Sequence, residues 1–359
     1  MRIAFIVIFL SSWVLNLPAR ELPVKKDNLP FSEENLKKML IEKRPAEFIL
    51  GQTKERRNIE AWFFPGTSDY NALVIGGVHG SELSSIEVTR ALIQQLLAGS
   101  KSYYNVIIIP SLFPDNALKA LSSPGRIGST DNLGRYSMTA SVDPNRQKPT
   151  PGKAYDENNG LDHLGRMIEI ENQLLLQLIQ TFKPQRIINV HAIRNTGYGG
   201  VYADPRTDNT GIALGYLSDS QLAITIARYI DEHGGNVNGN NLYSNPTALY
   251  YKDPEPVPTG NFQKRNMAGS ILDSNRGSGV SLGTWASTAV TNDIDPSKNR
   301  DAMRIITMEY PGCKRPADYK DPSEQLFQQK QVDIYSSSIR IIFLGNYYVE
   351  DKPGNMAKK

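Results

Sequence analysis

The chain has 359 residues, of which 40% are hydrophobic and 9% aromatic, as in an ordinary globular protein with a sizeable core. Its 40 Lys and Arg residues nearly balance 37 Asp and Glu residues, and no basic run or basic stripe with interleaved aromatics points to nucleic acid as a partner. The single cysteine, Cys313, excludes an internal disulfide bond and fits a small half-buried residue better than a redox group.

Residues 1–19 have the outline of a secretory signal peptide. Arg2 precedes an apolar run from Ile3 to Val14, which is too short to span a bilayer, and the small residue Ala19 stands before the predicted cut. We therefore expect a secreted or periplasmic protein with no stable membrane insertion after removal of the signal. An uncleaved anchor is the alternative.

After the signal we expect an N-terminal leading segment over 20–55, a main domain over 56–349 and a polar tail over 350–359. The leading segment should hold a short helix capped by Ser32. In the main domain the pattern predicts neighbouring strands at 58–64 and 72–78, further strands at 106–110, 186–191 and 304–309, and helices at 83–97, 161–182, 218–233 and 321–344. This order predicts a single α/β domain with a central mixed, mostly parallel twisted sheet flanked by helices.

Three of these strands end on a histidine or a carboxylate. The first leads into His79-Gly-Ser-Glu82, the second into His191 and the third into Glu309. Because open α/β sheets build their sites at the carboxyl ends of strands, we expect these side chains to meet at one edge. Two imidazoles and a carboxylate are a typical ligand set for one catalytic Zn²⁺, which leaves Glu309 as a base that is not a ligand. Taken alone, the first motif equally fits a helix start with a well-placed acid.

A polar stretch between the strands, Asp143-Pro-Asn145-Arg146, suits the same site. The guanidinium of Arg146 beside the amide of Asn145 can hold a substrate carboxylate through parallel hydrogen bonds. Asp143 can accept the free N–H of His79 and so direct the other ring nitrogen at the metal. The alternative for this stretch is an Asp-Pro turn with a solvated arginine.

In order and spacing these motifs resemble the zinc carboxypeptidase family of the carboxypeptidase A type over about residues 56–312: His79-x-x-Glu82, Asp143-x-Asn145-Arg146, His191 and Glu309. Within that family, the opening Val-Ile-Gly-Gly-Val-His-Gly-Ser-Glu and the later Ser281-Leu-Gly-Thr-Trp285 look closer to bacterial cell-wall peptidases of the murein peptide amidase type. The resemblance implies a carboxypeptidase-like fold, the zinc ligands and base named above, and carboxylate binding by Asn145 and Arg146.

The resemblance also implies an earlier arginine that stabilises the developing oxyanion, for which Arg135 is the better-spaced match and Arg126 the second. The family's mobile substrate-contacting tyrosine has no clear counterpart here. Tyr250, Tyr251 and Trp285 are candidates, and we take Trp285 as a substrate-binding residue.

The chain departs from the family where Gln147 and Lys148 replace the usual Asn-Phe after the conserved arginine, so the shape of that loop stays open. The Asn-, Gly- and Pro-rich stretch between Gly234 and Arg300 is expected to wall the substrate cleft. His163 and His233, on predicted helices, are expected to be surface or capping residues.

These features predict a secreted zinc metallopeptidase, a metallocarboxypeptidase or peptide amidase. We expect it to hydrolyse an amide bond next to a free carboxylate in a peptide or muropeptide, within peptidoglycan stem peptides. One alternative is an aspartoacylase- or succinylglutamate desuccinylase-like hydrolase of N-acyl amino acids, which Arg135-Tyr136 before the Asp143 motif mildly favours. Another is a non-catalytic wall-binding protein of the same fold.

Overall fold

The computed structural model describes residues 25–137, 142–209, 216–240 and 279–348, together with Leu214 and Leu242. The predicted signal peptide at 1–19, the tail at 350–359 and the candidates Tyr250 and Tyr251 lie outside the described residues. Within the described part, no helix is both long enough and apolar enough to cross a bilayer.

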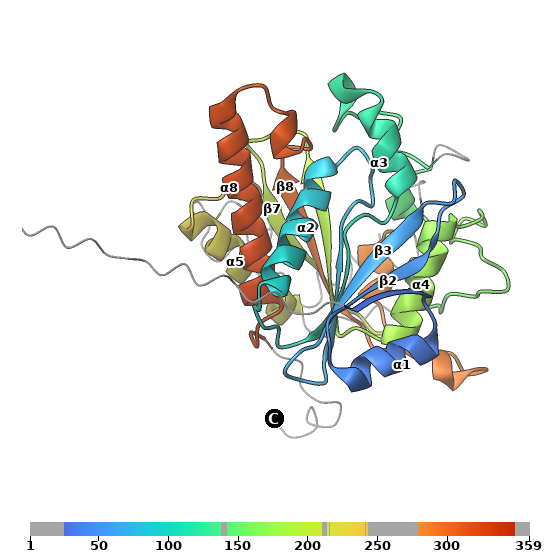
Figure 1. Ribbon diagram of the computed structural model, residues 1–359. Helices are drawn as coiled ribbons and strands as arrows, with labels where there is room; N and C mark the ends of the chain where they lie inside the picture. The colour runs from blue at the N-terminus through green and yellow to red at the C-terminus, as the bar shows by residue number, and fades with distance from the viewer. Residues whose placement is uncertain are drawn as a thin grey trace, which may run out of the picture.

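A single eight-stranded sheet with the order β1-β2-β3-β5-β4-β6-β8-β7 forms the centre of the molecule (Figure 1). Its four inner strands β5, β4, β6 and β8 run parallel, whereas β3 and β7 pair antiparallel on either side of them. The sheet is therefore mixed and mostly parallel, as predicted. The strands are β1 Lys25–Pro30, β2 Ala46–Gln52, β3 Asn58–Phe64, β4 Asn71–Ile75, β5 Asn105–Ile109, β6 Arg186–Ile193, β7 Gly200–Asp204 and β8 Arg304–Pro311.

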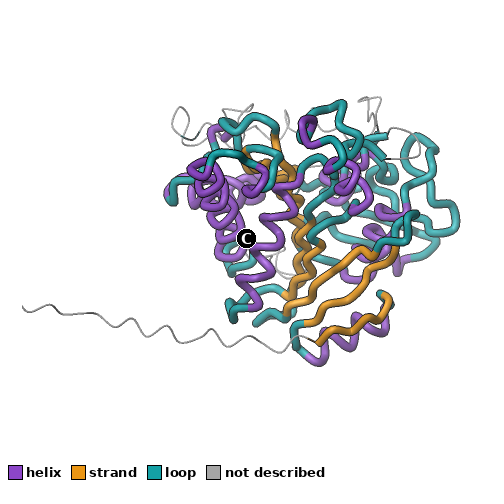
Figure 2. Tube along the Cα trace, turned by 45° about the horizontal axis from the view of Figure 1, so that its top comes forward, coloured by secondary structure: helices purple, strands orange, loops and turns teal. Residues whose placement is uncertain are grey.

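Helices cover both faces of the sheet (Figure 2). Apolar side chains of α2, α5 and α8 form one core with one face, and those of α1, α4 and α7 form a second core with the other. Alternate residues of β4 divide between the two cores, since Ala72 and Val74 belong to the first and Leu73 and Ile75 to the second. The helices are α1 Glu33–Glu42, α2 Leu83–Leu97, α3 Pro114–Leu121, α4 Ile170–Phe182, α5 Tyr216–Glu232, α7 Leu282–Ala286 and α8 Pro322–Ser338.

The leading segment expected over 20–55 supplies two strands and a helix to this architecture. The Oγ of Ser32 accepts a hydrogen bond from the N–H of Asn35 and caps α1, which ends at Lys43 in the left-handed conformation. Strand β2 pairs antiparallel with β3, and β1 pairs parallel with β2 at the edge of the sheet. The leading segment and the residues from 56 onward therefore share one sheet.

The predicted neighbouring strands β3 and β4 do not pair with each other. Strand β5 lies between them, antiparallel to β3 and parallel to β4. The crossover through α2 returns the chain to the sheet beside β4, the usual result of a strand-helix-strand unit. The prediction that β3 and β4 are direct neighbours was wrong, because sequence order alone does not show that a later strand is inserted between them.

The helix predicted over 161–182 begins only at Ile170. Before it, the Oδ1 of Asp162 accepts hydrogen bonds from the N–H groups of Leu164 and Arg166, and Gly165 has a φ of +74°. An aspartate that bonds to nearby backbone N–H groups offers the chain an alternative to a helix, and a left-handed residue ends one. The apolar periodicity before 170 therefore belongs to a turn.

A buried carboxylate ties α5 to β8 at the end of the sheet away from the predicted site. Asp219 is fully buried and accepts hydrogen bonds from the Nε of Arg304 at 2.8 Å and the Nε of Arg206 at 2.9 Å. Removing one partner of such a pair leaves a buried charge without compensation.

We expect Asp219→Ala to lower the free energy of unfolding by about 3–5 kcal/mol. The exposed Asp293→Ala should change it by less than about 0.5 kcal/mol. Urea denaturation followed by circular dichroism measures both. Equal stability of Asp219→Ala and the wild type would show that the two arginines do not depend on this carboxylate.

Candidate metal centre

The first ligand loop joins the end of β4 to the start of α2. The N–H of Glu82 donates to the carbonyl of His79 at 3.1 Å, which closes a turn with both side chains on one side. Gly80 lies inside this turn, where an added Cβ would sit 2.1 Å from the backbone carbon of Asn116 and 2.4 Å from the nitrogen of Ala117. Only a residue without a side chain allows α3 to approach the loop this closely.

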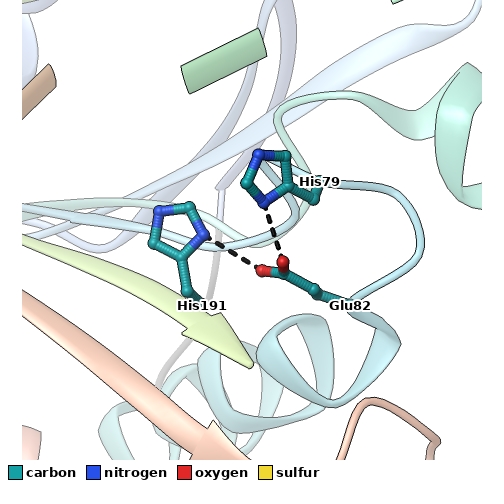
Figure 3. Close-up of side chains that lie close together, drawn as sticks. All are labelled: His79, Glu82 and His191. Carbon is teal, nitrogen blue, oxygen red and sulfur yellow. Dashed lines mark hydrogen bonds and ion pairs between the residues drawn. The ribbon is translucent and has the colours of Figure 1, made fainter. Parts of the chain in front are cut away.

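His79, Glu82 and His191 converge at the carboxyl ends of β4 and β6, as the sequence predicts (Figure 3). The Nδ1 of His79 lies 2.8 Å from one carboxylate oxygen of Glu82, and the Nδ1 of His191 lies 3.0 Å from the other. All three side chains are buried, and one ligand atom from each lies within 4.8 Å of the others. Among the described residues this is the only group of histidine, cysteine and acidic side chains with spacing suited to a metal ion.

The second ring nitrogen of each histidine has a partner of its own. The Nε2 of His79 lies 2.8 Å from the Oδ1 of Asp143, so Asp143 orients this imidazole as predicted. The Nε2 of His191 lies 2.8 Å from the Nδ2 of Asn189, while the buried Oδ1 of Asn189 has no hydrogen-bond partner. Turning this amide over would let Oδ1 accept the Nε2 proton of His191 and leave Nδ1 free as a ligand. The surroundings of the centre therefore fit a metal bound through both Nδ1 atoms.

The charges of the centre support each other. Burial alone would raise the pKa of Glu82, but His79 and His191 hold it well below its usual range. Burial would lower the pKa of His79, yet the carboxylates of Glu82 and Asp143 outweigh it and raise the pKa to about 9. Because metal ligands must be deprotonated, binding of a divalent cation would release a proton from the imidazole.

Glu309 lies beside the centre without belonging to it. Its Cα is the register partner of His191 in the pairing of β6 with β8, so both side chains leave the same face of the sheet. The side chain of Glu309 is half-buried and makes no hydrogen bond or ion pair with another described residue. Burial raises the pKa of its carboxyl, opposed by His191 and supported by Glu82. This is the placement expected of a base that is not a ligand.

Of the two candidate arginines, the structure brings Arg135 to the centre. Its Nη1 donates to Glu82 at 2.6 Å and lies 3.3 Å from the Nδ1 of His79, whereas its buried Nε has no partner. Arg126 is exposed in a single turn of 3₁₀ helix over Pro124–Arg126. The carboxylate of Glu82 thus contacts the guanidinium of Arg135 in addition to the two histidines.

The predicted substrate-binding pair also adjoins the centre. Asn145 and Arg146 belong to a 3₁₀ turn over Pro144–Arg146 that is capped by Asp143. The Nδ2 of Asn145 lies 3.4 Å from the Nε2 of His191, and its Oδ1 accepts a hydrogen bond from the N–H of Leu282 at 3.2 Å. Arg146 is half-buried, with its Nη1 bonded to the carbonyl of Asn145.

Trp285, predicted to bind substrate, does not line the centre. It is fully buried in the core between α4, α7 and the sheet, and its Nε1 donates to the carbonyl of Lys153 at 2.9 Å. The guanidinium of Arg300 lies 4.4 Å from the centre of its ring. The motif that contains Trp285 instead serves the site through the backbone N–H of Leu282, which holds Asn145.

Three further residues lie outside the centre, as expected. His163 bonds through Nδ1 to the hydroxyl of Thr150, and His233 is exposed and stacked on Tyr229. Cys313 is buried, which raises the pKa of its thiol. Asn189 was not among the residues predicted for the site. Its position two residues before His191 in a strand, on the same face, is the pattern that could have identified it.

No family model matches the chain, and no curated protein matches it. Among solved structures it is similar to murein-tripeptide amidase MpaA from Escherichia coli O157, with 14% identity and a TM-score of 0.43 over 82% of this chain and 91% of that one. It is also similar to a metallo-carboxypeptidase from Burkholderia cenocepacia, with 13% identity and a TM-score of 0.40 over 87% of this chain and 69% of that one. Similarity at this level says nothing about the activity of the chain, which must be inferred from the residues of the centre.

Metal analysis tests the centre directly. After incubation with excess Zn²⁺ and desalting, we expect about one ion per chain, held by three protein ligands. His191→Ala should lose this ion, whereas the exposed His233→Ala should keep it. Asp143→Asn should bind zinc about 10- to 100-fold more weakly, because it supports a ligand without being one. A wild-type zinc content in His191→Ala would place the ion elsewhere.

Gly80→Ala tests the fit of the ligand loop against α3. The added methyl group would meet backbone atoms that cannot rotate away, so the loop must shift. We expect zinc affinity to fall at least about tenfold, since ligand bonds near 2 Å tolerate little displacement. Gly125→Ala is the matched control, because its Cβ would meet nothing within 4 Å. Competition with a chelator measures both affinities; equal values would contradict the steric argument.

Proposed function

We propose that this protein is a zinc-dependent hydrolase that cleaves an amide bond next to a free carboxylate. The observation that carries the proposal is the buried group His79, Glu82 and His191 with Glu309 in register beside it. Nitrogen and carboxylate ligands in this number suit a catalytic zinc ion. Bound there, zinc would polarise the scissile carbonyl and lower the pKa of water.

Glu309 is the proton carrier of the proposed reaction. It accepts the proton of the attacking water and returns it to the leaving amine, a task that requires a carboxylate not occupied by other partners. Its position supports this role, because its side chain leaves the same face of the sheet as His191 and has no hydrogen bond or ion pair to a described residue. The pKa of a general base is best placed near the working pH, and burial moves that of Glu309 upward.

Arg135 is proposed to stabilise the oxyanion that forms on the substrate carbonyl. Its guanidinium already lies at the carboxylate of Glu82, and its Nε has no hydrogen-bond partner. A planar guanidinium with an unused N–H can donate to a developing negative charge while it keeps its ion pair.

Asn145 and Arg146 are proposed to hold the substrate carboxylate. The amide of Asn145 lies next to His191, so a carboxylate bound at this turn would place the neighbouring amide bond over the centre. The peptide or amino-acid substrate is thereby selected by its free carboxylate rather than by Trp285.

For the substrate we propose peptidoglycan stem peptides, and for the location the periplasm or the exterior of the cell. The predicted signal peptide at 1–19 and the motif resemblance to cell-wall peptidases support this assignment. An N-acyl amino acid hydrolase remains the second candidate, because its substrates also contain an amide bond next to a free carboxylate. The pair Arg135-Tyr136, which precedes the Asp143 motif in the chain, also favours it.

Incubation with purified muropeptides and, separately, with N-acetyl-aspartate and N-succinyl-glutamate distinguishes these functions. We expect mass spectrometry to show shortened muropeptides and intact N-acyl amino acids. The reverse result would assign the second candidate. Binding of muropeptides without hydrolysis, together with absence of bound zinc, would indicate a wall-binding protein.

Glu309→Gln should lower kcat by about 10²- to 10⁴-fold, the usual contribution of a general acid–base group. Zinc content should stay at the wild-type level, because Glu309 is not among the ligands. Glu324→Gln, an exposed residue of α8, is the matched control and should retain full activity. Unchanged turnover in Glu309→Gln would remove this residue from the reaction.

A further inference from the structure

The turn that carries Asn145 and Arg146 rests on a buried lysine. Lys148 is only 1% exposed, and Gln147 beside it is equally buried. Lysine is almost never fully buried unless its amine has partners, because removing a charge from water is costly.

The partners of Lys148 come from the turn and from α4. Its Nζ donates to the Oδ1 of Asn172 at 2.7 Å and to the carbonyl of Pro144 at 3.2 Å. The fully buried Asn172 in turn donates through Nδ2 to the same carbonyl and to the Oε1 of Gln147, both at 2.9 Å. Lys148 and Asn172 together therefore satisfy the carbonyl of Pro144 and bind the turn to the helix.

This network holds whether or not the amine is protonated. Burial, the largest influence, lowers the pKa of Lys148 to about 7. A neutral amine still has two N–H groups, and Lys148 has two acceptors. With an apolar residue in its place, the Oδ1 of Asn172 would lose the only donor that the described residues give it, and the carbonyl of Pro144 would lose one of two.

Besides its cap by Asp143, the turn is held at two other points. The N–H of Leu282 bonds to the side chain of Asn145, and the Nη2 of Arg166 bonds to the carbonyl of Arg146. These contacts fix one end of the turn, and the pair Lys148–Asn172 fixes the other. Without that pair, the backbone of Pro144 could rotate, and the two side chains that follow would lose their common orientation.

We propose that Lys148 and Asn172 are positioning residues that hold Asn145 and Arg146 in the arrangement that binds a substrate carboxylate. The inference rests on the proposed function, since it takes the role of Asn145 and Arg146 from there. Neither Lys148 nor Asn172 touches the substrate. Their effect is expected in the preference for a free carboxylate and not in metal binding.

The test compares two model substrates, an N-acetylated tripeptide with a free carboxylate and the same tripeptide as its carboxamide. In Lys148→Met we expect kcat/KM for the free acid to fall about 10- to 100-fold, mainly because KM rises. Small displacements of groups that position a substrate, here Asn145 and Arg146, have effects of this size. The kcat/KM for the carboxamide should change less than about threefold, since that substrate has no free carboxylate for Asn145 and Arg146 to bind. Zinc content should remain that of the wild type.

Lys153→Met is the matched control, since Lys153 is exposed in the same region and only its backbone contacts Trp285. Asn172→Leu provides a second variant if Lys148→Met does not fold, and should show the same loss of preference. The double variant should cost no more than the larger single one, because both residues act through one carbonyl. A wild-type preference for the free acid in either folded variant would overturn the proposal.

If the wild type hydrolyses neither tripeptide, the proposed function fails for such peptides, and hydrogen exchange then decides the positioning role alone. The N–H of Arg146 bonds to Asp143 and that of Lys148 to Val280, so both report on the turn. We expect both amides to exchange at least about tenfold faster in Lys148→Met. Unchanged exchange would overturn the proposal, independently of the activity.

Discussion

The parallel pairing of β4, β6 and β8 is the constraint on which the centre depends. Parallel strands place their carboxyl ends at one edge, about 4.8 Å apart, and this brings the loop after β4 to His191 and places Glu309 at its side. A slip of one residue would turn His191 or Glu309 to the opposite face. Apolar side chains on both faces of these strands fix the register, so the two cores determine the geometry of the candidate metal ligands.

The sequence predicted most of this sheet, because its inner strands are short and each contains an apolar run, which in β4, β5 and β8 is followed by Gly or Pro. It also predicted that His79, Glu82 and His191 converge, since a histidine or an acid at the end of such a strand can point only to the edge of the sheet or to the core. It did not predict that β5 separates β3 from β4, because strand pairing depends on contacts between distant residues. Nor did it show that Asp162 bonds to local backbone N–H groups, which shortened α4 at its start.

Among the predicted site residues, Trp285 does not line the centre. An aromatic residue next to a motif of the site suggests contact with a ligand, but the same ring can fill a core if its N–H finds an acceptor. That acceptor is the carbonyl of Lys153, distant in sequence and invisible to any local pattern. Asp143 was predictable because a histidine ligand needs a partner for its second nitrogen. The partner of Lys148 on α4, Asn172, could not be predicted, because the contact depends on how α4 packs and no local sequence pattern shows this.

The insertion of β8 between β6 and β7 has a consequence for the order in which the protein matures. Among the described strands, β7 pairs only with β8, although it precedes β8 in the chain by about a hundred residues. During synthesis the three candidate ligand residues emerge well before the strand that carries Glu309. A nascent chain that ends before residue 304 therefore has the candidate metal ligands but lacks the proposed proton carrier. On the proposed function, the last described strand to leave the ribosome would therefore complete the centre, with α8 the only long helix still to follow among the described elements.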